Sequence, residues 1–402
     1  MSIMAGKILD MHNSCNASSY WAQRILAQLA YGAKISSIKD GKYDAVINDV
    51  IQYVYDKFKE DGTITKATAN KAEEMILDLK EDAKGFNIIC CAHAHIDMNW
   101  MWRYDETVAI TLDTFRTVLN LMNEYPDFTF SQSQASVYRI VEQYDPAMLE
   151  EIKQRVKEGR WEVTATTWVE TDKNMPSGES LARHILYTKK YLSKLLDLDP
   201  DSLKIDFEPD TFGHNMNVPE ICAKGGVKYY YHCRGDDGEN IYRWIAPSGE
   251  SILVYRELTW YNAAINPEMA MYVPEFCTKY GIDTMLKVYG VGDHGGGPTR
   301  RDIERIMDMN TWPVFPNIRF GRYDEFFSLI EEQADNIPVV ECDEQNFIFT
   351  GCYTSQSRIK MANRMSEAIL NEAEAFNTMS HLLGTYDYSS EQFANAWEKV
   401  LF

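Results

Sequence analysis

From Phe86 onwards, short apolar runs alternate with amphipathic stretches, and this alternation constrains the fold more than any other feature of the chain. The runs NIICCA, FTFSQS, RWEVTATTWV, LKIDFE and MLKVYGV are each followed by a stretch with apolar residues at helical spacing. Repeated strand-then-helix units predict a parallel sheet covered by helices, either doubly wound or closed into a barrel. Six or seven such units can be counted, so the sequence predicts an α/β fold. The runs YRWIA and SILVYRE flank Pro247-Ser248-Gly249 and predict a hairpin excursion from this series.

Helical segments flank the alternating region on both sides. Apolar residues at three- and four-residue spacing predict helices in residues 1–85, and this spacing returns from about Glu341 to the end. The predicted organisation is a helical N-terminal segment over 1–85, a β/α domain over 86–340 and the beginning of a helical bundle over 341–402.

The composition is that of a folded protein that does not bind nucleic acid. Of the 402 residues, 45% are apolar and 25% are charged, which is ordinary for a globular protein. Lys and Arg number 40 and Asp and Glu number 60, so the net charge is 40 − 60 = −20, whereas phosphate binding needs a basic face. The charge also argues against an anionic membrane surface, and no apolar run approaches the ~20 residues of a membrane span. The eight cysteines are scattered without a CxxC pair, so we expect free thiols and a cytoplasmic location.

Polar residues collect where the predicted strands end. The residues that follow these strands include His95, Asp97, Glu170, Asp172, Asp210, Arg234 and Asp293. In a parallel α/β architecture, ligands bind beyond the carboxyl ends of the strands. A core needs no such collection of acids at one edge, so the sequence predicts that the functional site lies there.

His95 and Asp97 have the spacing of a metal-binding pair. Residues two apart at a strand end point to the same face, so the imidazole and the carboxylate leave together. Together they form half of a divalent-metal site, and zinc is the first expectation. In the alternative interpretation, His95 packs at the rim and Asp97 caps the next helix. Asp210 favours the metal, because a second carboxylate balances the charge.

Two carboxylates that converge on one pocket would suit glycoside hydrolysis, one as nucleophile and the other, with a raised pKa, as the acid that protonates the leaving oxygen. Asp210 and Asp293 are the candidates, although spacing alone does not rank them above Glu170, Asp172, Asp206 and Glu208. Trp100 and Trp102 could form a platform for a sugar ring, or could be core aromatics. A literal GxGxxG begins at Gly290, but a dinucleotide site is disfavoured because Asp293 would lie beside the pyrophosphate.

Seven motifs, in the same order, resemble those of glycoside hydrolase family 38, the retaining α-mannosidases, and most of all its cytosolic and bacterial members. They are HAHIDMNWMWRYDET, FSQSQASVY, GRWEV, WVETDKNMPSGESLARH, EPDTFGH, GDHGGGPT and TGCYTSQSRIKMANR. The resemblance runs from about residue 70 to the end. It implies a seven-stranded β/α barrel-like domain followed by a helical bundle.

The resemblance also implies roles for individual residues. His95, Asp97 and Asp210 would be zinc ligands, and Asp210 would also be the nucleophile. Asp293 would be the acid/base residue of a double displacement that hydrolyses α-mannosides with retention. The residues that would contact substrate are Trp100, Arg234, His294 and Tyr353.

The sequence departs from the family pattern at several points. Met98-Asn99 replaces the usual Pro-Gly, and His294 stands where glycine is common, so it would face the metal or line the pocket. In relatives, the last zinc histidine lies just beyond the position of Phe402, so we expect an incomplete front portion whose partner is a second copy or the remaining part of the enzyme. The alternatives are a zinc amidohydrolase or deacetylase, and an inert sugar-binding fragment.

Overall fold

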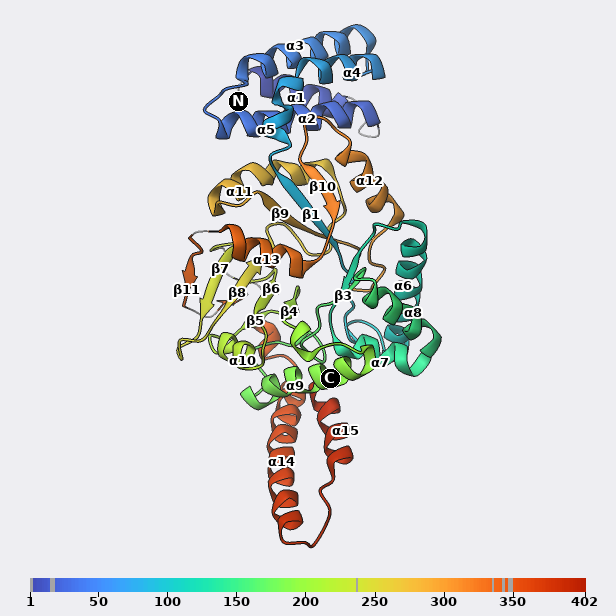
Figure 1. The fold of residues 1–402 in the computed structure, drawn as a ribbon, viewed down its shortest axis with the longest axis vertical. Coiled ribbons are helices and arrows are strands. Elements are labelled where there is room, and N and C mark those ends of the chain that lie inside the picture. The colour runs from blue at the N-terminus through green and yellow to red at the C-terminus, as the bar shows by residue number, and fades with distance from the viewer. Residues whose placement is uncertain (1–2, 15–18, 236–237, 335, 342–343, 346–349) are drawn as a thin grey trace. The chain divides into compact units, whose positions relative to one another are not determined.

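A computed structural model describes residues 3–14, 19–235, 238–334, 336–341, 344–345 and 350–402. The chain has mixed helical and strand structure (Figure 1). It divides into two compact units, and the chain passes from one unit to the other several times. The first contains Met1–Ala92, Ala263–Gly290 and Pro298–Asn336, and the second contains His93–Asn262, Val291–Gly297 and Ile337–Phe402.

The first unit begins with the predicted helices and continues into a small parallel sheet. The N-terminal elements are α1 (Ile3–Ser14), α2 (Tyr20–Ile38), α3 (Asp44–Asp61), α4 (Lys66–Met75), η1 (Leu77–Leu79) and α5 (Lys80–Ala83). In α2, Ile25, Leu29 and Ile35 recur at helical spacing and are buried. The sheet has the order β10 (Asn317–Phe320), β1 (Asn87–Ala92), β9 (Thr284–Tyr289), and all pairs are parallel. The remaining helices are η3 (Pro267–Tyr272), α11 (Val273–Tyr280), α12 (Arg300–Asn310) and α13 (Tyr323–Gln333).

The second unit contains a five-stranded sheet. Its order is β11 (Val339–Val340), β7 (Ile241–Ile245), β8 (Ser251–Arg256), β6 (Tyr229–His232), β4 (Ile205–Glu208). β4, β6 and β8 are parallel, so their carboxyl ends open on the same edge. β7 and β8 form the predicted hairpin, because they pair antiparallel around Pro247-Ser248-Gly249.

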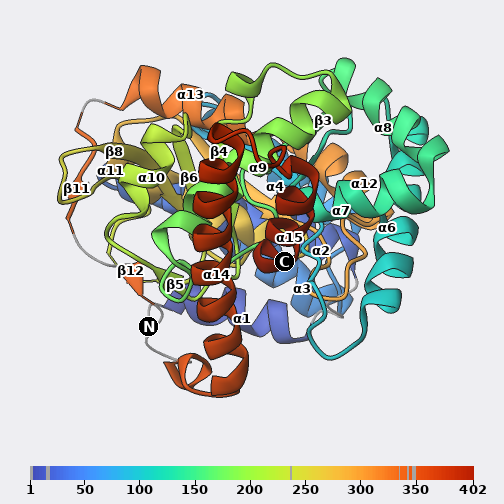
Figure 2. The same cartoon turned by 90° about the horizontal axis from the view of Figure 1, so that it is seen from below.

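Two short strand pairs and the remaining helices complete the second unit (Figures 1 and 2). β2 (Phe130–Gln132) pairs in parallel with β3 (Trp161–Val163), and β5 (Gly213–His214) pairs with β12 (Glu344–Gln345). The helices are α6 (Tyr104–Glu124), α7 (Ala135–Tyr144), α8 (Pro146–Lys157), α9 (Gly178–Leu196), η2 (Pro200–Ser202), α10 (Val218–Lys224), η4 (Thr350–Tyr353), α14 (Ser357–Leu382) and α15 (Ser390–Leu401).

The α/β class is confirmed, but the seven-stranded barrel is not. Among the described residues, the strands form separate sheets of three, five, two and two strands. β2 and β3 are only three residues long and form a ladder with each other alone, and one isolated bridge, between His93 and Ser131, extends from them. A barrel requires a continuous ladder around the whole ring of strands, and these short segments do not supply one.

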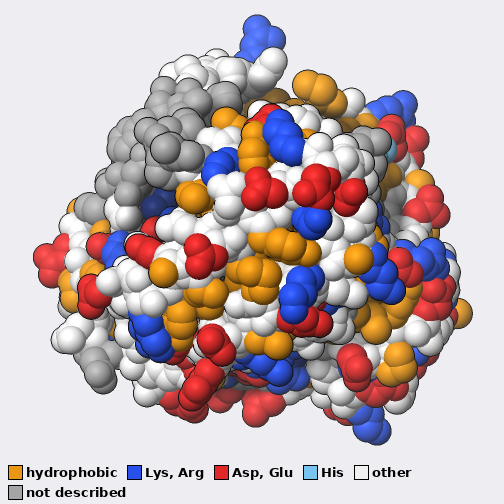
Figure 3. All heavy atoms as spheres, turned by 90° about the horizontal axis from the view of Figure 1, so that it is seen from above, with side chains coloured by type: hydrophobic (Ala, Val, Ile, Leu, Met, Phe, Trp, Pro, Cys, Tyr) orange, Lys and Arg blue, Asp and Glu red, His pale blue; other side chains and the backbone are white. Residues whose placement is uncertain are grey.

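The surface and the helices give no sign of a membrane-spanning segment. Within the described part of the chain, no helix is both long and apolar enough to cross a bilayer. Figure 3 shows one face, whose coloured area carries basic side chains dispersed among acidic ones. This area therefore lacks the clustered basic patch that nucleic-acid binding needs.

A buried ion cluster lies beside the five-stranded sheet. Asp206 and Glu208 are two residues apart in β4, so their side chains leave the strand on the same face. Between them lies Lys173, whose Nζ is 3.3 Å from Oδ2 of Asp206 and 2.7 Å from Oε1 of Glu208. All three side chains are almost completely buried. The two acids thus have a cationic partner inside the fold.

Replacing Lys173 should destabilise the second unit strongly. Lys173→Met would leave two buried carboxylates without their cation, and breaking a buried pair in this way costs about 3–5 kcal/mol. We expect a lower urea midpoint of unfolding, whereas Lys190→Met, at an exposed position of α9, should leave the midpoint nearly unchanged. Equal midpoints for the two variants would contradict this account of the cluster.

Candidate active site

His95 lies at the centre of the candidate site and is almost completely buried. Its Nε2 is 2.6 Å from Oε2 of Glu170, and its Nδ1 is 3.3 Å from Oδ1 of Asp293. The Oδ1 atom of Asp97 is 4.0 Å from the same Nε2. The ring of Tyr261 packs edge-on against the imidazole, with centroids 5.1 Å apart. One imidazole therefore contacts or approaches three carboxylates.

His95, Asp97 and Asp293 form a group that could hold a metal ion. One potential ligand atom from each of them lies within 4.8 Å of the others. The group is held by the backbone as well, because Asp97 N donates to the carbonyl of Asp293 at 2.9 Å. The predicted pair of His95 and Asp97 is thus brought together, and the carboxylate that joins this group is that of Asp293.

Asp210 lies in the same site but has different contacts. Its carboxylate forms an ion pair with Arg234, as expected for residues that follow the neighbouring parallel strands β4 and β6. Its backbone N–H donates to Oε1 of Glu170 at 2.5 Å, and the Thr211 hydroxyl lies 3.3 Å from the same oxygen. Glu170 therefore links His95 to the backbone of Asp210.

The crowding of acids shifts the pKa values of the site. Burial raises the pKa of Asp97 to about 6, and the carboxylates of Glu170, Asp293 and Asp210 add to this shift against the opposing effect of His95. Burial and the charge of Glu170 also raise the pKa of Asp210. The hydrogen bond from His95 lowers the pKa of Asp293, whereas the sequence predicts a raised pKa for the acid. Burial opposes protonation of His95, but the carboxylates of Glu170 and Asp293 hold its pKa above the ordinary value.

A cavity of about 750 Å³ opens beside these residues. Its lining consists of Asp97, Trp100, Asp210, Phe212, Arg234, Trp260, Tyr261, Asp293, Gly351 and Cys352. An adjoining cavity of about 400 Å³ shares Asp97, Asp210, Phe212 and Cys352 and adds Tyr353. Trp100 and Trp260 keep 61% and 41% of their surfaces exposed, so both are available to stack on a ligand. This combination of aromatic walls and converging carboxylates suits a polar ring-shaped ligand.

Three of the four predicted substrate contacts line these cavities, and the fourth does not. Trp100 and Arg234 lie in the larger cavity and Tyr353 in the adjoining one. His294 lies outside both linings, with its Nε2 2.7 Å from Oε1 of Glu106 and its ring packed against Trp102 at 4.5 Å. The structure therefore associates His294 with a surface ion pair.

The four other candidate acids differ in the groups that they contact. Asp172 accepts the backbone N–H groups of Asn174 and Met175 at 2.8 and 3.0 Å, which stabilises its own turn. Asp206 and Glu208 contact Lys173 in the buried ion cluster. Glu170 alone among these four acids contacts His95.

Tyr261 and Asn262 were not predicted from the sequence. The Tyr261 hydroxyl and the Asn262 side-chain amide lie 3.4 and 3.3 Å from Oδ1 of Asp293. They follow SILVYRE, which the sequence pattern assigned to a hairpin. Because this strand, β8, also pairs in parallel with β6, its carboxyl end opens on the same edge as those of β4 and β6. If the sequence had shown that β8 pairs with β6 as well as with β7, both residues would have been located.

The glycine-rich loop is shaped by close packing around His95. A Cβ atom on Gly292 would lie 3.0 Å from Cβ of His95 and 2.9 Å from Cβ of Asn262. At Gly295, the backbone has φ +76°, and a Cβ would lie 2.5 Å from Cγ2 of Ile110. The glycines therefore allow the loop that carries Asp293 to approach the histidine.

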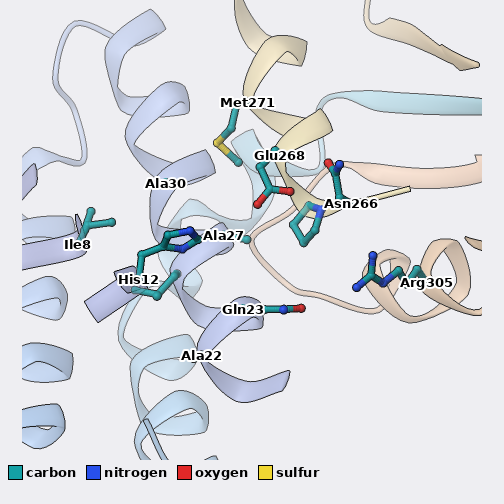
Figure 4. A pocket seen from close by; sticks show the side chains of 12 residues that line it. Ile8, His12, Ala22, Gln23, Ala27, Ala30, Asn266, Glu268, Met271 and Arg305 are labelled. Carbon is teal, nitrogen blue, oxygen red and sulfur yellow. The ribbon is translucent and has the colours of Figure 1, made fainter. Parts of the chain in front are cut away.

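A separate cavity of about 300 Å³ lies within the first unit (Figure 4). Its apolar wall is formed by Ala22, Ala27 and Ala30 of α2, and Glu268, Arg305 and His12 approach it from other elements. Its lining lacks a carboxylate–histidine cluster like that around His95. The chemistry therefore points to the second unit.

The sequence matches the family model of the glycosyl hydrolases family 38 N-terminal domain over residues 85–351, about two thirds of the chain. It matches that of the α-mannosidase middle domain over residues 348–402. The first of these models describes a domain of the glycosyl hydrolases. The chain belongs to glycosyl hydrolase family 38, and the resemblance seen in its motifs is confirmed.

Individual relatives agree with this assignment. α-Mannosidase G of Dictyostelium discoideum is 29% identical over 319 residues, which cover 77% of this chain and 29% of that protein. The α-mannosidase of Saccharomyces cerevisiae is 28% identical over 340 residues, which cover 78% of this chain and 31% of the relative. The fold is similar to the crystal structure of an α-mannosidase from Enterococcus faecalis V583, with a TM-score of 0.64 and 20% identity over 79% of this chain and 38% of that one. The chain thus spans about a third or less of the length of these curated relatives.

Adding one methyl group to Gly292 should disturb the site without unfolding the chain. Gly292→Ala would force its Cβ against those of His95 and Asn262, so we expect divalent-metal affinity to fall on the order of 10-fold. Calorimetric titration with zinc measures this effect. Gly178→Ala is the matched control, since nothing lies within 4 Å of its added Cβ. Unchanged affinity in Gly292→Ala would contradict the packing argument.

Proposed function

We propose that this chain carries the catalytic carboxylates of a retaining α-mannosidase. The observation that carries the proposal is the convergence of Asp97, Asp210 and Asp293 on one sugar-sized cavity beside His95, in a chain of family 38. The relatives named above are α-mannosidases, which supports α-mannosides as the substrate class.

The chain's own residues divide the chemistry as follows. Asp210 attacks the anomeric carbon, and its ion pair with Arg234 and the Glu170 contact at its backbone hold it in position. Asp293 gives a proton to the leaving oxygen and then takes one from water. The hydrogen bond from His95 favours the carboxylate form of Asp293, which is the form that activates water in the second step. Trp100, Arg234 and Tyr353 contact the sugar, and Trp260 is a further candidate platform.

The donor set fits a zinc ion. His95 and Asp97 would hold the ion together with Asp210, as the resemblance implies, because an Asp293 carboxylate bound to zinc could not also give the proton. An imidazole and carboxylate oxygens are ordinary zinc ligands. A divalent cation would offset the negative charge that, after burial, contributes to the raised pKa values of Asp97 and Asp210. When bound, zinc would supply positive charge to the hydroxyls of the sugar.

The two alternative functions are less well supported. A zinc amidohydrolase would need a lysine or further histidines beside His95, whereas its described partners are carboxylates and Tyr261. An inert sugar-binding fragment would not require two acids in different protonation environments, such as Asp97 and Asp293. The α-mannosidase explains both the acids and the family membership.

The remaining parts of the proposal concern architecture, partners and location. We retain the barrel-like arrangement, the boundaries at 85 and 340, and the cytoplasmic location as predictions from the sequence. α14 supports a protein–protein contact, because it exposes an apolar series that consists of Ile359, Met361, Met365, Ile369, Phe376, Met379 and Leu382. A second copy or the remaining part of an α-mannosidase would fit such a face.

Removing the nucleophile should abolish turnover. With an aryl α-mannoside, Asp210→Asn should lower kcat by about 10³-fold or more, because no covalent mannosyl intermediate can form. The control is Asp201→Asn, at an exposed position of η2, which should keep the activity of the parent chain. Release of product with retained anomeric configuration, followed by NMR, would support the double displacement. An active Asp210→Asn chain would rule out this nucleophile.

Metal removal should also reduce turnover. Treatment with a chelator is expected to lower hydrolysis of the aryl α-mannoside at least about 10-fold, and added zinc should restore it. Metal analysis before and after treatment shows whether the lost activity follows the lost ion. Full activity in a zinc-free sample would contradict the metal assignment.

A further inference from the structure

Gln134 is a buried glutamine that connects two loops of the candidate site. Its side-chain Nε2 donates to the carbonyl of Ile96 at 2.9 Å, and its Oε1 accepts the backbone N–H of Glu170 at 3.0 Å. Only 2% of its surface is exposed. In these bonds the side chain contacts only backbone groups, those of Ile96 and of the cavity-lining Glu170, so its contribution is made through its neighbours.

Each neighbour belongs to a functional loop. Ile96 lies between His95 and Asp97, so a bond to its carbonyl holds the peptide that joins the two predicted metal ligands. Glu170 contacts both His95 and the backbone of Asp210. The side-chain amide of Gln134 therefore links the His95–Asp97 pair to Glu170. Glu170 in turn orients His95 and the backbone of Asp210, the proposed nucleophile.

The backbone of Gln134 has a conformation that is unfavourable for a residue with a side chain. Its dihedral angles are φ +65° and ψ 119°, outside the regions that a side-chain-bearing residue ordinarily adopts. Such a conformation is unfavourable and persists where surrounding structure imposes it. Here Ala135 N and Ser136 N donate to the carbonyls of Thr167 and Trp168 at 3.0 and 2.9 Å. Moreover, Gln134 precedes α7 at its N-cap position, yet its side chain makes no cap bond to that helix.

We propose that Gln134 is a positioning residue that sets the spacing between the His95–Asp97 pair and Glu170, and thereby the affinity of the site for a divalent metal. This inference rests on the proposed function, because it assumes that His95 and Asp97 hold the ion. Gln134 acts only through the Ile96 carbonyl and the Glu170 backbone. Without it, the two loops keep their covalent connections but lose their shared anchor.

Gln132 provides a matched control on the same strand-end segment. It is also buried, and its Nε2 donates to the carbonyls of Ala94 and Ser133 at 3.2 and 3.3 Å. It therefore holds the histidine-bearing loop but makes no bond to Glu170. Gln132→Met and Gln134→Met remove the same chemical group from neighbouring buried positions, and only the second breaks the link between the two loops.

The test measures zinc affinity of the full chain by competition with a chromophoric chelator, well below the unfolding temperature of each variant. We expect Gln134→Met to lower the affinity by 10- to 100-fold, the range reported for outer partners of metal ligands, and Gln132→Met to change it less than about threefold. Gln134→Gly removes the same bonds while relieving the unusual φ. It should be at least as stable to urea as Gln134→Met and bind zinc as weakly.

The outcomes separate this inference from the proposed function. Zinc binding by the parent chain without mannoside hydrolysis would overturn the proposed activity and leave the comparison of glutamine variants readable. Parent-like affinity in Gln134→Gly or Gln134→Met would overturn the positioning role. Equal losses in Gln132→Met and Gln134→Met would also overturn it, because the link to Glu170 would then have no special effect. A parent chain that binds no zinc would refute both the metal assignment and this inference.

Discussion

The carboxylate of Glu170 is the contact on which the site depends. One oxygen lies 2.6 Å from Nε2 of the buried His95, and the other accepts the backbone N–H of Asp210 at 2.5 Å. A carboxylate is planar and short, so it fixes the separation between the two groups that it joins. The histidine would otherwise present a buried polar nitrogen without a partner, which is costly inside a protein. Glu170 therefore both satisfies the buried imidazole and holds it at a set distance from the backbone of Asp210.

Concentrating acids around one imidazole has an electrostatic cost that the fold offsets locally. Arg234 pairs with Asp210, and His95 favours the ionised form of Asp293. Within the described part of the chain, the only cationic group that the structure places beside Asp97 is the shared histidine, and burial raises the pKa of Asp97 to about 6. Perturbed acids of this kind mark functional sites, and a divalent ion is the species that would relieve the remaining charge. Deeper in the second unit, Lys173 likewise offsets the negative charges of Asp206 and Glu208, but it is buried and not accessible to a ligand.

Sequence reasoning succeeded where a residue's position follows from the end of its own strand. Asp210 and Arg234 follow β4 and β6, and the parallel pairing of these strands was sufficient to bring them together. It failed for Tyr261, because the hairpin around Pro247-Ser248-Gly249 concealed the parallel pairing of β8 with β6. The barrel prediction is not confirmed for a similar reason. Local alternation predicts strands, but it does not show which strands pair or whether the hydrogen-bonded ladder closes into a ring.

Local pattern was enough to identify the α/β class, the resemblance to the family and several of the residues that gather around His95. It could not rank Glu170 against Asp172, because two acids at alternate positions carry the same local signal. Tertiary contacts separate them: Asp172 caps its own turn, whereas Glu170 meets a histidine 75 residues away. Likewise, Asp293 meets His95 across 198 residues, and Gln134 links loops that no periodicity connects. Short-range patterns report secondary structure, but the partners of a buried charge are chosen by the packing of distant segments, and those partners decide what each acid does.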